Sequence, residues 1–203
     1  MPRRCREAVV IALTLVAIGQ ARAEVLDSAF TQLDSRKCRH TPGRDVEDYG
    51  SWRCSGYKGI PVFLSAGDQR MFVSFGRKAA DEPAAGETFP SFNDAYKGTI
   101  KWRLEKRSNG EMRPFATIRR WNVKIAGDED TTRASGRFLV VTRLGPGGVC
   151  HVAHVDATDD PKANEMARDL ADKHARTFEC EKDRVIVVSE KRKDYARPYG
   201  ERD

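Results

Sequence analysis

Residues 148–180 read GVCHVAHVDATDDPKANEMARDLADKHARTFEC and decide the fold that the sequence predicts. The first part, Val149 to Asp156, alternates with a period of two and predicts a strand. From about Pro161 to Phe178, apolar residues recur every three or four positions, which predicts an amphipathic helix. At about 1.5 Å per residue, this helix is long enough to return along the strand and bring Cys180 near Cys150. The stretch therefore predicts a strand, a turn and a helix closed by a disulfide.

The first 23 residues have the three parts of a secretory signal peptide. An arginine-rich start precedes the apolar run Ala8 to Ile18, and Ala21-Arg22-Ala23 fits a cleavage site. The run is about half the ~20 residues needed to span a bilayer, which argues against a membrane anchor. We therefore expect a periplasmic or secreted protein with no membrane span after cleavage.

The net charge divides evenly between the predicted signal peptide and the rest of the chain. The whole chain carries +6, of which residues 1–23 supply +3 from four arginines and one glutamate. The remaining +3 is weak evidence for a polyanionic partner. We predict one domain over residues 24–189 and a charged, disordered tail over residues 190–203.

Four cysteines remain after the predicted cleavage: Cys38, Cys54, Cys150 and Cys180. An even number in an exported chain predicts two disulfides. Three pairings are possible, and we favour Cys38–Cys54 and Cys150–Cys180 because each closes a local unit. No C-x-x-C pair and no Cys/His cluster with zinc spacing occurs, so neither a metal site nor a cofactor is predicted.

The rest of the chain predicts an α+β fold. We expect an antiparallel, mostly meandering sheet of about seven strands, with the C-terminal helix packed on one face. Residues 24–36 have helical spacing and predict a short helix. Residues 77–90 (RKAADEPAAGETFP) lack periodicity. We predict a solvated connection there, with a lid over a site as the alternative.

Two hairpins have predictable registers. Between residues 99 and 121, a three-residue loop with Gly110 left-handed keeps each face consistent and pairs Trp102 with Ala116. In the second hairpin, a four-residue loop over residues 145–148 pairs Arg137 with Asp156. This pairing predicts a cross-strand ion pair.

The first hairpin also carries the strongest local bias of charge. The predicted register gathers Lys101, Arg103 and Arg119 on one outer face, a candidate binding surface. An anionic envelope component, such as a polysaccharide or a lipid headgroup, or an acidic protein would suit it. A solvated strand face explains the same pattern. Nucleic acid is not expected, since the face lacks interleaved aromatic residues.

The segment His151-Val-Ala-His154-Val-Asp156 invites a metal or catalytic interpretation. Residues three apart on a regular strand point to opposite faces, so His151 and His154 are not expected to share an ion. His154 and Asp156 can share a face, which leaves a small periplasmic hydrolase as the alternative function. No nucleophile elbow, Walker motif or dinucleotide-binding glycine pattern occurs, and no catalytic residue is predicted.

Several segments together resemble a family of short exported proteins of Gram-negative bacteria. They include CSGYKGIPV at residues 54–62, IKWRL at 100–104, PFATIRRW at 114–121, CHVAHVD at 150–156 and FEC at 178–180. The resemblance implies a periplasmic, disulfide-bonded domain, but the family has no established activity or site residues to transfer. The leading hypothesis is a non-enzymatic binding or envelope-associated protein.

Overall fold

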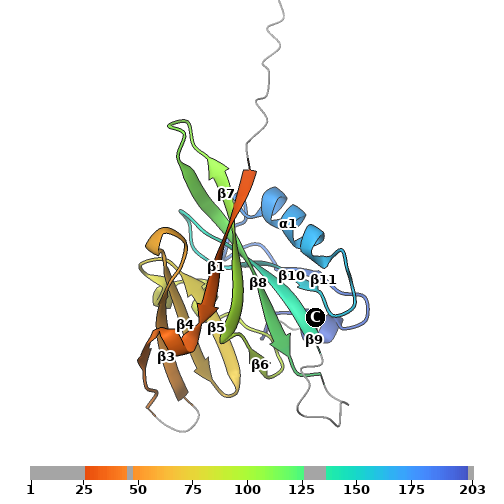
Figure 1. Ribbon diagram of the computed structural model, residues 1–203. Coiled ribbons are helices and arrows are strands. Elements are labelled where there is room, and N and C mark those ends of the chain that lie inside the picture. The colour runs from red at the N-terminus through yellow and green to blue at the C-terminus, as the bar shows by residue number, and fades with distance from the viewer. Residues whose placement is uncertain (1–25, 45–47, 126–135, 201–203) are drawn as a thin grey trace, which may run out of the picture.

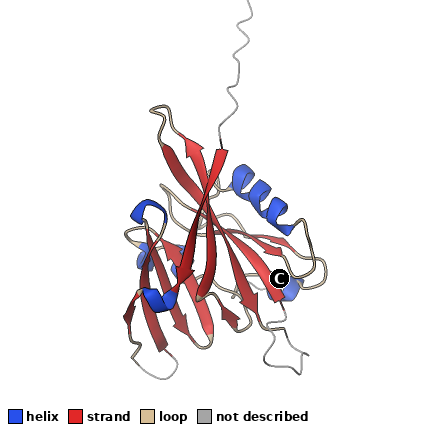
Figure 2. Cartoon of the chain, viewed as in Figure 1, coloured by secondary structure: helices blue, strands red, loops and turns tan. Residues whose placement is uncertain are grey.

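The computed structural model describes residues 26–44, 48–125 and 136–200 (Figure 1). The predicted signal peptide lies outside the described residues. Within them, no helix is long and apolar enough to cross a membrane. The described chain has an α+β fold with two sheets and one main helix, α1 (Ala163–His174) (Figure 2).

The larger sheet has seven strands in the order β1-β7-β8-β9-β10-β11, with β6 paired to β8. Its strands are β1 (Leu26–Asp34), β6 (Asn93–Asp94), β7 (Lys97–Lys106), β8 (Met112–Val123), β9 (Gly136–Arg143), β10 (His151–Asp156) and β11 (Ile186–Val188). All pairs are antiparallel except β10 with β11, which is parallel. The expectation of a purely antiparallel sheet is wrong at this pair, because α1 crosses between the two strands and returns the chain to the same end.

The smaller sheet was not predicted. It has four antiparallel strands in the order β2-β3-β4-β5: β2 (Arg39–Thr41), β3 (Asp48–Ser55), β4 (Pro61–Gly67) and β5 (Arg70–Phe75). The described residues therefore contain eleven strands in two sheets, instead of about seven strands in one sheet. The larger sheet lies between the smaller sheet and α1 (Figure 1).

The predicted helix over residues 24–36 is wrong, because Leu26–Asp34 forms β1 and pairs with β7 along its whole length. The pairing satisfies backbone groups that an isolated short helix would leave exposed. Leu33 enters the core between the sheets, and Trp102 donates from its indole nitrogen to the Thr31 hydroxyl at 3.0 Å. These contacts with a distant strand outweigh the local helical spacing.

Two apolar cores hold the layers together. Between the sheets, Leu64, Val73 and Phe75 of the smaller sheet belong to one cluster with Trp102 and Trp121 of the larger. On the other face, a stripe of residues on and just beyond α1 packs across β8, β9 and β10; it consists of Ala163, Ala167, Ala171, Ala175 and Phe178. The predicted helical stripe is confirmed, although His174 is exposed.

Both predicted disulfides are confirmed. Cys38 and Cys54 have Cα atoms 4.7 Å apart, and Cys150 and Cys180 have Cα atoms 5.6 Å apart. The second bond joins the start of β10 to the segment that follows α1. It therefore fastens the helical layer to the strand that precedes it.

The first hairpin follows its predicted register only near the turn. Gly110 is left-handed, with a φ of +83°, and Leu104 lies opposite Pro114, as a three-residue loop requires. Phe115 is then an extra residue, and Trp102 lies opposite Thr117 instead of Ala116. The predicted register is wrong beyond this bulge because one inserted residue moves every later side chain to the other face.

The second hairpin departs from its predicted register in the same way. His151 lies opposite Thr142, as expected, but Val152 is an extra residue. Asp156 therefore lies opposite Phe138, and the predicted ion pair between Arg137 and Asp156 is wrong. The two bulges flank β9 at adjacent positions, since Ala116 pairs with Arg143 and Thr142 pairs with His151.

The disulfide between Cys150 and Cys180 closes a separation of 30 residues. Replacing both cysteines by alanine should lower the free energy of unfolding by about 3 to 4 kcal/mol, because the unfolded chain regains the entropy of the open loop. Urea unfolding measures the loss. Amide hydrogen exchange should show that α1 loses protection first.

The matched control replaces Cys38 and Cys54 by alanine, which should lower stability while leaving the exchange of α1 close to wild type. Free thiols at residues 150 and 180 in peptide maps of the unreduced protein would contradict the arrangement.

Candidate functional site

The three basic residues of the predicted binding surface do not share a face. Arg103 lies on the helix side of β7, where its Nε and Nη2 atoms each donate to the Asp172 carboxylate of α1 at 2.8 Å. Lys101 is half-buried on the same side. Arg119 points to the opposite side and is only 2% exposed, donating to the carbonyl oxygens of Ala95 and Lys97.

The expectation of one exposed basic face is therefore wrong, and the bulge at Phe115 is the reason. The one-residue shift places Arg119 opposite Ile100, on the face that enters the core between the sheets. Burial lowers the pKa of the Arg119 guanidinium to about 9, and Asp94 opposes this shift. Partial burial and the charges of Arg168 and Arg103 lower the pKa of Lys101.

The bulge at Phe115 separates the basic residues, whereas the bulge at Val152 brings the two histidines of β10 together. His151 Nδ1 lies 3.0 Å from His154 Nε2, and the two rings are 1% and 0% exposed. The expectation that the histidines point to opposite faces is wrong, because Val152 adds one residue between them. Phe89 packs on the His154 ring with centroids 4.5 Å apart.

The hydrogen bonds of this histidine pair fix its protons. His154 Nδ1 lies 2.6 Å from the Ala196 carbonyl oxygen, which only accepts, so this nitrogen carries a proton. His154 Nε2 then accepts from the protonated Nδ1 of His151. Nε2 of His151 is left as a buried acceptor with no hydrogen-bond partner among the described residues. The two uncharged rings therefore form a chain of hydrogen bonds, in which His151 donates to His154 and His154 donates to the Ala196 carbonyl oxygen.

Burial keeps both histidines uncharged. It lowers the pKa of His154 to about 4, against a smaller opposing effect of the bond to Ala196. Burial, together with neighbouring His154, lowers the pKa of His151 well below its usual value. No group of three or more His, Cys, Asp or Glu side chains that could hold a metal ion occurs in the described parts of the chain.

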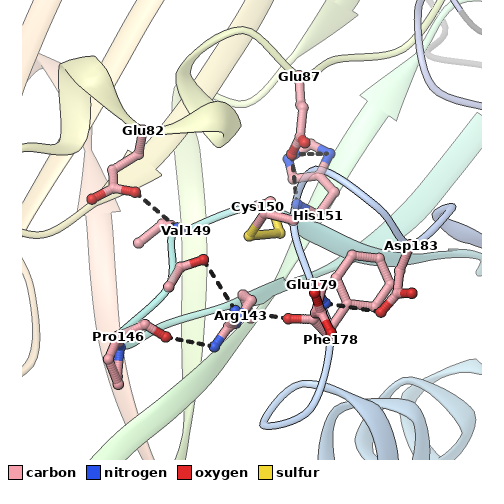
Figure 3. The surroundings of a disulfide bond; sticks show 12 residues. Glu82, Glu87, Arg143, Pro146, Val149, Cys150, His151, Phe178, Glu179 and Asp183 are labelled. Carbon is pink, nitrogen blue, oxygen red and sulfur yellow. Dashed lines mark hydrogen bonds and ion pairs between the residues drawn. A yellow bond between two sulfur atoms is a disulfide. The ribbon is translucent and has the colours of Figure 1, made fainter.

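Residues 77–90 cover the pair instead of forming a solvated connection, so that prediction is wrong. The segment contains η3 (Ala79–Asp81) and η4 (Pro83–Ala85) and buries Ala84 and Phe89. Carboxylate oxygens of Glu82 and Glu87 accept from the backbone N–H groups of Val149 and His151, at 2.9 and 2.5 Å (Figure 3). The segment thereby supplies hydrogen-bond acceptors to the backbone N–H groups just before and at the start of β10.

The chain after β11 is also packed, so the prediction of a disordered tail is wrong for residues 190–200. It contains α2 (Lys193–Ala196), whose last residue, Ala196, is completely buried. Tyr199 donates from its backbone to the Thr88 carbonyl oxygen at 2.8 Å. The tail and the 77–90 segment therefore close together over the histidine pair.

Asp156 serves this closure rather than a catalytic site. Its carboxylate accepts from the Thr158 backbone at 3.0 Å, from Ser189 at 3.0 Å and from Arg192 at 3.2 Å. Partial burial raises the pKa of Asp156, but these hydrogen bonds lower it by a larger amount. The net shift of the pKa is therefore downward. The side chain that the sequence linked to His154 instead ties the tail to β10.

Cavities on the described surface differ in their lining. One of about 340 Å³ lies between the start of α1 and the loop after β11 and is lined by Asp156, Asp159, Asp160 and Arg192, among others. A second, of about 600 Å³, lies beside the disulfide of Cys180. The third, of about 240 Å³, is walled almost entirely by apolar groups. His151 and His154 line none of these three cavities.

Sequence reasoning missed the polar residues that organise the second cavity. Arg143, at the end of β9, donates to the carbonyl oxygens of Phe178 at 2.7 Å and Pro146 at 2.9 Å (Figure 3). It holds the turn before β10 against the segment after α1, next to the disulfide. No local pattern marks Arg143, Glu82 or Glu87, because each bonds a backbone group more than 30 residues away in the sequence.

Comparison of the chain with protein-family models, curated proteins and solved structures finds no match. The resemblance to exported proteins of Gram-negative bacteria therefore stays a prediction.

The buried histidines should make stability depend on pH. Their pKa values are lower in the folded than in the unfolded chain, so the unfolded chain binds more protons and unfolding is favoured as the pH falls from about 6.5 to about 4. His154 alone should contribute about 3 kcal/mol to this loss. Urea unfolding across this range measures the slope.

The control carries His151→Leu and His154→Met and should lose most of the slope, whatever its stability at neutral pH. The usual pKa of an aspartate is 3.8, and that of Asp156 is lowered. Its contribution to the free energy of unfolding is therefore lost only below this pH range. An unchanged slope in the double variant would show that other groups titrate.

Proposed function

We propose that the protein is a non-enzymatic binding protein of the periplasm or the secreted space, and that its ligand is a small anionic amphiphile of the envelope. The observation that carries the proposal is the apolar cavity of about 240 Å³. Ligand sites are typically concave and mostly apolar, with a few polar groups that orient the ligand. This cavity has that character, whereas acidic and basic side chains line much of the other two.

The cavity lies where the two sheets meet at one end. The smaller sheet contributes Phe75 and Gly76 at the end of β5, with Ile60 just before β4. The larger sheet contributes Pro114 of β8 and the turn residues between β9 and β10, which are Leu144, Gly145 and Val149. Its walls suit a short aliphatic chain.

Arg113 is the one charged residue among the described residues that line this cavity. Its Nε donates to the Glu105 carboxylate at 3.0 Å, and Arg176 approaches the same carboxylate at 4.0 Å. Two guanidinium groups therefore approach one carboxylate at this end of the sheet, and the Glu82 carboxylate lies on the Val149 N–H of the cavity wall. In this proposal, a carboxylate or phosphate headgroup pairs with the Arg113 guanidinium while the chain occupies the apolar walls.

A binding role fits the polar groups better than a catalytic one. The alternative hydrolase needs a substrate to reach His154, but that ring is completely buried and bonded to Ala196. Asp156 is engaged by Thr158, Ser189 and Arg192. The two disulfides are compatible with export, as the proposal requires.

Octanoate is a direct probe of the cavity. We expect the protein to bind octanoate in isothermal titration, and Leu144→Trp to weaken this binding at least about tenfold because the indole fills the cavity. Arg120→Trp is the matched control, since Arg120 is exposed on β8 away from the cavity. It should bind octanoate as the wild type does.

The role of charge is tested with Arg113→Gln. Octanoate binding should weaken by about threefold to fivefold, as for a partly exposed ion pair, while octanol binding stays unchanged. Equal loss for both probes would contradict the assigned headgroup site. Failure of the wild type to bind either probe would contradict the proposed function.

A further inference from the structure

The first strand leaves a long open edge on the larger sheet. β1 is the outermost strand, and its nine residues pair with β7 without a register shift. No other described backbone group bonds to β1 between Leu26 and Asp34. The strand contains no proline, lysine or bulge, which are the usual devices that prevent an edge from pairing with another chain.

An exposed aromatic side chain stands at the centre of this edge. Phe30 is 63% exposed, more than any other large apolar side chain of the described residues. It lies opposite Lys101 of β7, whose Nζ is 5.8 Å from the ring centroid. The helical layer packs chiefly across β8, β9 and β10 and leaves the Phe30 side chain exposed.

We infer that two copies of the chain associate through β1, antiparallel and centred on Phe30, to form one continuous sheet across the dimer. The two-fold axis is perpendicular to the sheet, so each side chain keeps its face and the two Phe30 rings come together. A row Lys101–Phe30–Phe30–Lys101 then crosses four strands. This interface shares no residue with the apolar cavity and does not depend on the proposed function.

The sequence of β1 is self-complementary in this register. Asp27 lies opposite Leu33 of the other copy, and Asp34 lies opposite Leu26, so no like charges face each other. Ser28 lies opposite Gln32, which places two polar side chains together. Opposed like charges would destabilise the pairing, whereas an aromatic pair at the centre stabilises it.

The association closes at two copies. The opposite end of the larger sheet is β11, which has only three residues and contacts α2. It offers little edge for a further copy to pair with. An isologous contact that uses the same strand from both partners forms a closed dimer.

Sedimentation velocity of the full chain, from low to high micromolar concentration, tests the dimer. Phe30→Asp places two carboxylates opposite each other and should weaken the dimer by about tenfold to a hundredfold. Tyr49→Asp replaces an exposed aromatic residue of β3 and should leave the dimer unchanged. Circular dichroism should show that both variants keep the wild-type fold. A monomeric wild type throughout, or a dimer insensitive to Phe30→Asp, would overturn the inference.

Cysteine cross-linking tests the register. Phe30→Cys should form an intermolecular disulfide under mild oxidation, because directly opposed residues lie about 5 Å apart. Gln32→Cys should not, because the two copies of residue 32 lie about 14 Å apart in this register. Cross-linking of Gln32→Cys without cross-linking of Phe30→Cys would overturn the proposed pairing.

Discussion

The two bulges that flank β9 determine how the rest of the chain is arranged. Each inserts one residue into a neighbouring strand, Phe115 on one side and Val152 on the other, at almost the same level of the sheet. Both inserted residues join the core beneath α1, so two consecutive side chains on each strand face the helix. An inserted residue also increases the local twist of its strand. The larger sheet can therefore pack α1 on one face and the smaller sheet on the other.

The same shifts decide which polar groups enter the interior. Arg119 turns into the core between the sheets, and His151 and His154 meet on that side as well. Burying polar groups is costly unless their hydrogen bonds are satisfied. Backbone carbonyl oxygens accept some of these hydrogen bonds, those of Ala95 and Lys97 from the arginine and that of Ala196 from the histidine pair. All of these groups are distant in sequence from the side chains that they bond. Among the described residues, Nε and Nη1 of Arg119 and Nε2 of His151 have no hydrogen-bond partner.

The closure around the histidines uses three segments that have little regular structure. Residues 77–90 bring two carboxylates to the backbone before and at the start of β10, and the tail brings Ala196 and Tyr199. Cys180 fastens the segment after α1 to the same region. The apolar cavity at the end of the two sheets and the open edge of β1 lie away from this closure. The buried histidine pair is therefore separate from the cavity and the strand edge for which we propose binding.

The sequence by itself determined the α+β class, the helix after β10 and the form of the turn at Gly110, and it favoured, among three possible pairings, the two disulfides that the structure has. These features depend on short-range periodicity, on loop length and on residues that favour particular backbone angles, all of which a single chain displays. Only the tertiary structure decided the registers beyond the bulges, and with them the faces of Arg119, His151 and His154. It also decided the second sheet, the strand at Leu26–Asp34 and the packed tail. A bulge forms where curvature between two packed layers requires an extra residue, and that requirement comes from segments far away in the chain.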